Sequence, residues 1–210
     1  MNVIIIGAGG HAKVIVDILL SGRKTTVGFL DDNPALSNQI ILHLPVLGFI
    51  SDHIKFTDRN LFIMGIGSNV IRQTLVEKMS HVMWTEAIHS SAYVAHGVEI
   101  GIGSVIMAKS VINPCSYVGK HVIINTSASI DHDCVVEDFA HIAPGVNIAG
   151  NVHIGKRVFV GIGAKIINGT EANPLTIADD VIIGAGAVVT KSITEPGITV
   201  VGIPAKPLKR

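Results

Sequence analysis

The stretch VGKHVIINTSASIDHDCVV, residues 118–136, decides the fold, because an aliphatic residue recurs in it at every sixth position. The spacing continues on both sides, and fourteen consecutive sixth positions hold only isoleucine or valine. These positions are Ile88, Val94, Ile100, Ile106, Ile112, Val118, Ile124, Ile130, Val136, Ile142, Ile148, Ile154, Val160 and Ile166. Four residues after each comes a small or β-branched residue, in a series that runs from Ala92 to Thr170. A fixed period of six predicts a parallel β-helix.

The hexad follows from the geometry of such a helix. Six residues make one short strand and its corner, and three sides close a triangular coil of about eighteen residues. Coils stack at the strand spacing of about 4.8 Å, with the aliphatic position pointing inward and the small position near a corner. An α-helix cannot hold this pattern, because six is far from a multiple of 3.6. The series skips eleven residues from Ile166 to Ile177, so about five extra residues must leave the coil as a loop.

Composition limits the functional classes. The 210 residues are 48% hydrophobic but only 4% aromatic, as expected if a narrow interior is filled with Ile, Val and Ala. Sixteen basic residues balance sixteen acidic ones without a basic stripe, which argues against nucleic acid as a partner. Two cysteines are too few for a disulfide framework. Without a signal-like N-terminus or a membrane-length apolar run, we expect a cytoplasmic protein with no membrane partner.

The first 87 residues show a different pattern, that of alternating strands and helices. Residues 2–6 and 25–30 are expected strands, and a helix over about 11–20 separates them. The turn Gly7-Ala8-Gly9-Gly10-His11-Ala12 follows the first strand, and Asp31 and Asp32 end the second. Residues 61–64 should form a third strand, followed by Gly65-Ile66-Gly67-Ser68-Asn69 and a helix over 70–78, and residues 81–87 a last strand. We therefore predict a Rossmann-like α/β domain over 1–87 and a β-helix over 88–210.

Glycine turns that open a helix let the backbone approach a phosphate, and ligands of parallel α/β sheets bind beyond the carboxyl ends of the strands. We therefore expect a nucleotide at this sheet edge. The alternative is an ordinary tight turn between strand and helix. The predicted substrate-binding residues are Gly9, Gly10, His11, Asp31, Asp32, Gly65, Gly67 and Asn69.

The hexads and the ending Val201-Gly202-Ile203-Pro204-Ala205-Lys206 resemble the hexapeptide-repeat acyltransferases, whose fold is a left-handed parallel β-helix. Together with the N-terminal motifs, the whole chain resembles nucleotide-sugar acetyltransferases that N-acetylate an amino sugar, and the related sialic acid O-acetyltransferases. The stretches that carry this resemblance are residues 7–11, 29–32, 65–72 and 125–133. It implies acetyl-CoA as co-substrate, no metal, and a homotrimer with active sites between neighbouring subunits. A UDP-4-amino sugar in bacterial surface glycan biosynthesis would be one such substrate.

His132 is the best-placed histidine for acid–base chemistry. It follows the inward Ile130 by two residues, so it should point out from a corner, and its neighbours one coil away, Pro114 and Gly150, would not crowd it. Histidine suits proton transfer because its pKa lies near working pH. The adjacent Asp133 could orient the imidazole. From spacing alone, a solvated surface pair is the alternative; the resemblance implies that His132 is the base, although relatives often carry Glu where this chain has Asp133.

The resemblance implies further roles. Asn125 matches an active-site position, His141 one beside the acyl-CoA thioester, and His11 one near the sugar nucleotide. On late coils it implies backbone contacts to the cofactor. The predicted cofactor-binding set is His141, Ile162, Gly163, Gly184 and Ala185, and the loop over 168–174, longer than the family pattern, could line the same groove.

Three other functions remain open from the sequence. These are O-acetylation of a sialic acid, an NAD-binding protein with a structural β-helix, and a purely structural trimer. The sequence does not identify the sugar, the nucleotide base or the biosynthetic pathway.

Overall fold

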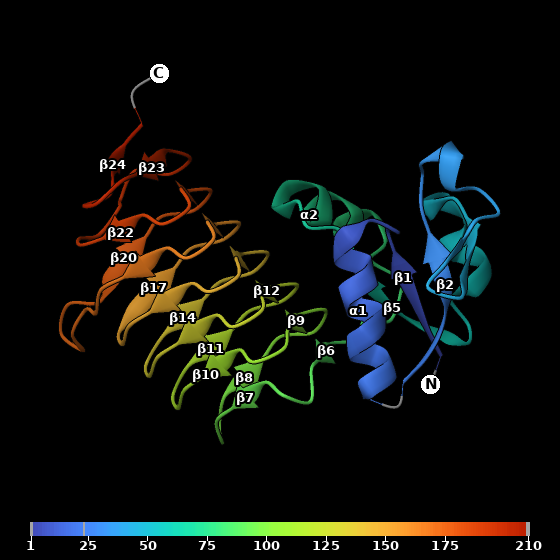
Figure 1. Ribbon diagram of the computed structural model, residues 1–210, viewed down its shortest axis with the longest axis horizontal. Helices are drawn as coiled ribbons and strands as arrows, with labels where there is room; N and C mark the ends of the chain where they lie inside the picture. The colour runs from blue at the N-terminus through green and yellow to red at the C-terminus, as the bar shows by residue number, and fades with distance from the viewer. Residues whose placement is uncertain (1, 23, 209–210) are drawn as a thin grey trace.

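The computed structural model describes residues 2–22 and 24–208. Figure 1 shows two parts side by side, an α/β part and a stack of coils. The α/β part has a five-stranded sheet of order β3-β4-β2-β1-β5, parallel except for β3. Its strands are β1 (Asn2–Ile6), β2 (Thr25–Leu30), β3 (Ile40–Ile41), β4 (Leu44–Gly48) and β5 (Asn60–Met64). Its helices are α1 (Gly10–Ser21) and α2 (Asn69–Lys78), with 3₁₀ helices η1 (Pro34–Leu36) and η2 (Ile50–Phe56).

Strand β1 is the centre of this sheet, because four of its residues are buried and it pairs with strands on both sides. Helix α1 covers one face of the sheet with apolar residues at helical spacing, among them Ile15 and Leu19. The same apolar cluster contains Val105 and Ile123 of the β-helix. Helix α1 therefore lies between the N-terminal sheet and the coils (Figure 1), which places its first turn at the junction.

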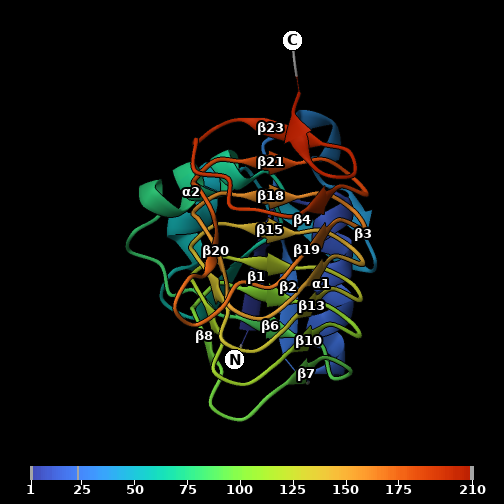
Figure 2. The ribbon, with the colours of Figure 1, turned by 90° about the vertical axis from the view of Figure 1, so that its left-hand side faces the viewer.

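The C-terminal part is a parallel β-helix with three sheets, which we number in the order the chain visits them. Successive strands of one sheet pair in parallel, as in Ile112 with Ile130 and Ile130 with Ile148. Figure 2 shows the coils stacked toward the C-terminus. The predicted fold class, a Rossmann-like domain followed by a parallel β-helix, is confirmed.

The first sheet holds β6 (Ala87–Ile88), β9 (Val105–Ile106), β12 (Ile123–Ile124), β15 (His141–Ile142), β18 (Phe159–Val160), β21 (Ile182–Ile183), β23 (Thr199–Val201) and the antiparallel β24 (Lys206–Pro207). The second holds β7 (Tyr93–Val94), β10 (Val111–Ile112), β13 (Ser129–Ile130), β16 (Asn147–Ile148), β19 (Lys165–Ile166) and β22 (Val188–Val189). The third holds β8 (Glu99–Ile100), β11 (Tyr117–Val118), β14 (Val135–Val136), β17 (Val152–Ile154) and β20 (Leu175–Ile177).

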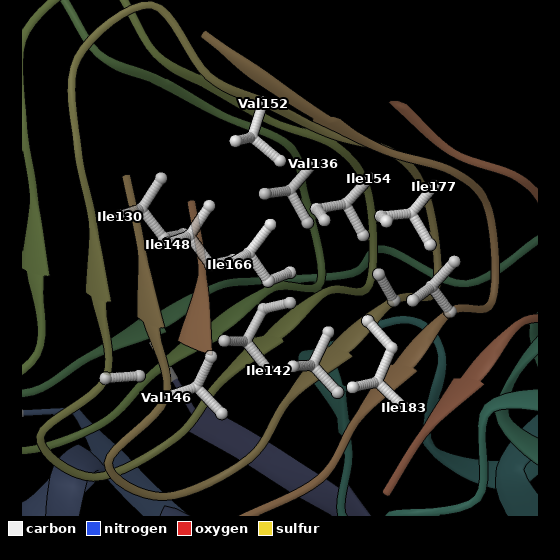
Figure 3. Close-up of a cluster of buried hydrophobic side chains, with 14 of the residues drawn as sticks. Ile130, Val136, Ile142, Val146, Ile148, Val152, Ile154, Ile166, Ile177 and Ile183 are labelled. Atoms are coloured by element: carbon white, nitrogen blue, oxygen red, sulfur yellow. The ribbon is translucent and has the colours of Figure 1, made fainter. Parts of the chain in front are cut away.

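The interior is the predicted aliphatic stack. In Figure 3, Ile130, Ile148 and Ile166 follow one another along one side of the coil. The small positions are buried as well, including Ala140 and Cys134. Each coil therefore covers the apolar side chains of the coil before it, as expected for a repeat architecture.

Two predictions about individual segments are wrong. Residues 81–87 do not form a strand: Trp84 makes only an isolated bridge with Phe62, and Ala87 already pairs with Val105 in the β-helix. Thr170 does not point inward. The inserted loop leaves the coil there, so Thr170 is exposed, and Leu175 pairs with Val152 and fills the inner position instead. Within the described residues, none of the helices is long and apolar enough to cross a membrane.

Candidate functional site

His132 and Asp133 form a pair, the His132 dyad, at the corner between the second and third sheets. Nδ1 of His132 lies 2.7 Å from Oδ2 of Asp133, and both side chains are about half exposed. A carboxylate can only accept, so Nδ1 carries the hydrogen and Nε2 keeps a free lone pair. The pKa of His132 is raised, first by the hydrogen bond to Asp133 and then by the charge of Asp131. Asp133, although one methylene shorter than a glutamate, thus reaches the imidazole.

Gly150, one coil further along the same corner, makes room for the imidazole. A Cβ atom on Gly150 would lie only 2.6 Å from Cε1 of His132. The ring therefore packs over a backbone without a side chain, which agrees with the prediction that Gly150 does not crowd His132. Any side chain at position 150 would turn the imidazole away from its present direction.

A second group, the junction cluster, consists of His11, Gly67, Asn125 and His141. Nε2 of His141 lies 3.1 Å from Nδ2 of Asn125, and Nδ1 of His141 lies 3.4 Å from the Gly67 carbonyl oxygen. Oδ1 of Asn125 accepts a hydrogen bond from the amide N–H of Thr126 at 2.8 Å, which fixes which end of its side-chain amide faces His141. The ring of His11, on the first turn of α1, has its centroid 6.4 Å from that of His141.

Both imidazoles of the junction cluster are held in their neutral form. Burial lowers the pKa of His141 to about 4, with a further contribution from the positive charge of Arg72. Burial also lowers the pKa of His11 to about 3, followed by the effects of His141 and Arg72. Nε2 of His11 is buried and has no hydrogen-bond partner among the described residues. These rings can accept or donate hydrogen bonds near neutral pH, but they are poor general bases.

One chain does not bring the two groups together. His132 follows β13 at the corner between the second and third sheets, whereas His141 lies on β15 of the first sheet, against the α/β part. The predicted catalytic set of His132, Asp133 and Asn125 is therefore divided, because Asn125 lies beside His141.

The glycine turns of the α/β part interlock at the sheet edge. A Cβ atom on Gly65 would lie 2.7 Å from that of Ala12, and one on Gly7 would lie 2.7 Å from Cγ1 of Ile66. Gly9 is the N-cap of α1 and Gly10 its first residue, both with open space around them. The turn thus presents open backbone at the first turn of α1.

The two acidic residues of that edge are engaged with the backbone. Oδ2 of Asp31 accepts the amide N–H of Ala8 at 2.7 Å, and Oδ1 of Asp32 accepts that of Ile50 at 2.8 Å. Asn69 bridges the two parts of the molecule, since Nδ2 donates to the carbonyl oxygen of Arg157 at 2.8 Å. These three side chains hold loops in place, and Asp31 occupies an amide that a dinucleotide phosphate would use.

The four late-coil residues of the predicted cofactor set, Ile162, Gly163, Gly184 and Ala185, lie at the corner between the first and second sheets. Asn125 lies at the same corner on an earlier coil. The structure also gives Gly184 a packing role, because a Cβ atom there would lie 2.7 Å from Cγ1 of Val201. Ile162 is 61% exposed. This corner is therefore an accessible, largely backbone surface that leads away from the junction cluster.

Two hollows lie near these groups. One lies between the turn after β5 and the first sheet, and it is lined by Gly67, Ser68, Asn69, Val70, Arg157, Phe159, Asp180 and Ile182. The ring centroids of Phe159 and His141 lie 5.2 Å apart in an edge-to-face arrangement, so this hollow begins beside the junction cluster. The other runs along the outer face of the second sheet and includes Asp131 and Asn168. It therefore begins beside the His132 dyad.

Comparison with known proteins identifies the family. Residues 2–79 match the family model described as the PglD N-terminal domain. GDP-perosamine N-acetyltransferase of Escherichia coli O157:H7 is 34% identical over 207 residues, which are 95% of this chain and 84% of that protein. An uncharacterised protein of Acanthamoeba polyphaga mimivirus is 35% identical over 106 residues. These residues are 50% of this chain and 21% of the viral protein.

Solved structures agree over the whole chain. PerB from Caulobacter crescentus, in complex with CoA and GDP-perosamine, superposes with a TM-score of 0.88 at 36% identity, covering 100% of this chain and 98% of that one. The acetyltransferase domain of PglB from Neisseria gonorrhoeae, in complex with acetyl coenzyme A, gives a TM-score of 0.89 at 35% identity, covering 99% and 98%. The chain belongs to the hexapeptide-repeat family of nucleotide-sugar N-acetyltransferases.

Proposed function

We propose that this protein transfers the acetyl group of acetyl-CoA to the amine of a nucleotide-linked amino sugar. One observation carries the proposal: a full-length match to GDP-perosamine N-acetyltransferases coincides with a His132 dyad whose Nε2 is free to take a proton. A cytoplasmic location remains a prediction from the sequence.

In the proposed reaction His132 acts as the base. The amine nitrogen attacks the thioester carbonyl carbon, a C–N bond forms, and Nε2 of His132 takes the proton that leaves the amine. The C–S bond then breaks, and the imidazolium returns the proton to the CoA sulfur. Asp133 stabilises the imidazolium through its 2.7 Å contact with Nδ1. Acetyl-CoA is the co-substrate and no metal takes part.

The division of the site supports a shared active site. The His132 dyad and the junction cluster lie on different sides of one β-helix, so a single copy offers either the base or the buried histidines at a given surface. In the proposed homotrimer, whose three-fold axis would lie between the copies and parallel to each β-helix, the dyad of one copy would face the corner of Asn125 and Gly163 on the next. Acetyl-CoA would lie in the groove between the two copies.

The substrate is proposed more narrowly from the relatives. Two of them are named for GDP-perosamine, a GDP-linked amino sugar. We therefore place GDP-linked amino sugars first, ahead of UDP- and dTDP-linked ones. The hydrogen bond from the Ala8 amide N–H to Oδ2 of Asp31 works against the NAD-binding alternative, because it occupies one of the amide donors of the first glycine turn.

The direct test is an assay of CoA release. The full-length protein is incubated with acetyl-CoA and a panel of GDP-, UDP- and dTDP-linked amino sugars, and the sugar product is checked for an added acetyl group by mass spectrometry. Each amino sugar has a matched control in which a hydroxyl replaces the amine. Acetylation that requires the amine supports the proposal, whereas acetylation of the hydroxyl analogue or of a free sialic acid would contradict it.

A further inference from the structure

Arg72, on α2, is a buried cation with only neutral partners. It is 1% exposed, and it donates from Nε to the carbonyl of His121 at 2.8 Å and from Nη2 to the carbonyl of Phe139 at 2.6 Å. Among residues 2–22 and 24–208, no carboxylate lies within ion-pair distance of it. Burying an unpaired charge costs several kcal/mol. A residue that served only to pack the junction would not need this charge.

The guanidinium joins both parts of the molecule at one point. His121 and Phe139 lie on successive coils of the β-helix, while Nη1 donates to the carbonyls of Ile66 and Gly67, at 3.3 and 3.1 Å, in the turn after β5. The planar fork of arginine can make these bonds at once, which a lysine ammonium cannot. Arg72 therefore fixes where the Gly67 carbonyl lies relative to the first sheet.

The same Gly67 carbonyl faces His141. Its oxygen lies 3.4 Å from Nδ1 of His141, and on the other side of the ring Nε2 faces Nδ2 of Asn125 at 3.1 Å. Oδ1 of Asn125 already accepts the amide N–H of Thr126, so Nδ2 is the end that donates to His141. Nε2 must then be the acceptor and Nδ1 must carry the hydrogen, which points at Gly67.

We propose that Arg72 is a positioning residue of the acetyl-transfer site: by fixing the Gly67 carbonyl on the β-helix, it holds His141 with its hydrogen on Nδ1 and with Nε2 toward Asn125. Its effect on catalysis rests on the proposed function, but its effect on His141 does not. The positive charge acts in the same direction, because it disfavours a second proton on His141.

The test reads the tautomer directly. The full-length protein is labelled with ¹⁵N-histidine, and the imidazole nitrogens are observed by NMR near neutral pH; the signals of His141 are those lost in His141→Gln. We expect the wild-type protein to show Nδ1 protonated and Nε2 unprotonated at His141. A hydrogen on Nε2 in the wild-type protein would overturn the proposal without any variant of Arg72.

Arg72→Met removes the donor while keeping an apolar stem. We expect His141 to show a mixture of tautomers, and kcat for amino-sugar acetylation to fall by roughly 10- to 100-fold, the scale of a small misplacement in an active site. KM for acetyl-CoA should change little. Arg72→Lys keeps the charge but cannot bridge Gly67 and the coils. Its kcat and its tautomer ratio at His141 should therefore lie between those of the wild type and of Arg72→Met.

Arg157→Met is the matched control. Arg157 also lies at the junction and reaches Gln73 of α2, but its guanidinium pairs with Asp180 and does not contact Gly67. In the Arg157→Met variant, His141 should keep the tautomer that it has in the wild-type protein. An unchanged His141 spectrum in Arg72→Met and Arg72→Lys would contradict the proposal, whether or not kcat falls. If no variant and no wild-type protein acetylates any amino sugar, the proposed function fails while the spectrum still decides the role of Arg72.

Discussion

His132 and His141 are nine positions apart in the sequence, yet the structure gives them opposite environments. His132 is about half exposed beside a carboxylate, and its pKa is raised. His141 is packed against the α/β part near a buried arginine, and its pKa is lowered to about 4. Two imidazoles whose pKa values are shifted in opposite directions are suited to different tasks. The exposed one can exchange a proton near neutral pH, and the buried one can only hold a hydrogen-bond direction.

The largest expected effect is that of His132→Ala. Removing a general base typically costs about 10² to 10⁴ in rate, so kcat should fall by that order while acetyl-CoA still binds. Steady-state kinetics and calorimetric titration with acetyl-CoA measure the two properties separately. A His132→Ala protein with nearly unchanged kcat would make the dyad an ordinary surface pair.

Gly150→Ala should come next. The new Cβ would meet the His132 ring, which can turn away because it is the end of a flexible side chain. We therefore expect kcat to fall by roughly 10- to 100-fold through misplacement of the base, with an unchanged melting temperature. A large loss of stability instead would show that Gly150 serves the coil and not the imidazole.

Asp133→Asn should have a smaller effect on rate, about tenfold, because it leaves the base in place. Asp133 raises the pKa of His132, so its loss should lower that pKa. Since the neutral imidazole is the active form, kcat/KM should rise with pH in both proteins, but at lower pH in the variant. A rising limb that stays in place would mean that another group sets the profile.

The buried histidines predict a steep loss of stability in acid. His11, His121 and His141 have pKa values lowered to about 3, 4 and 4, below the unfolded value of about 6.5. Between pH 6.5 and 4 the unfolded chain takes up protons that the folded chain does not, so the free energy of unfolding should fall by up to about 1.4 kcal/mol per pH unit for each group.

Urea unfolding at fixed protein concentration and several pH values measures this slope. His121→Phe removes one titrating group while keeping a ring stacked on Phe139, whose centroid lies 5.4 Å from that of His121. The variant should show a shallower slope. Equal slopes in the two proteins would mean that His121 titrates alike in the folded and unfolded chains.

The β-helix could be predicted because its period is local: an aliphatic residue recurs at every sixth position. Even the inserted loop was visible as a skipped period, although its inner substitute, Leu175, was not, because pairing with Val152 depends on where the chain re-enters the coil. His132 could be placed at a corner for the same reason. Its contact with Asp133 depends on a corner geometry in which Asp133 adopts a left-handed φ of 58°.

The junction cluster could not be assembled from the sequence. His11, Gly67 and His141 come from three separate segments, and they meet only because α1 and the turn after β5 pack on the first sheet. The burial of Arg72 could not be predicted either, because it is the only buried residue of α2 and its partners on the β-helix, His121 and Phe139, are far away in the sequence. Burial across a domain junction is a long-range property, and it decides the chemistry of every ionisable group there.

Mixing two inactive variants tests most directly whether the site is shared between copies. One variant is His132→Ala, which lacks the base, and the other is Asn125→Ala with His141→Ala, which lacks two side chains of the junction cluster. After subunit exchange at equal amounts, a site that takes each half from a different copy should be complete in about a quarter of cases. We predict recovery of roughly that fraction of wild-type acetyl transfer. No recovery, with exchange of subunits verified by mass spectrometry of differently tagged copies, would contradict the account.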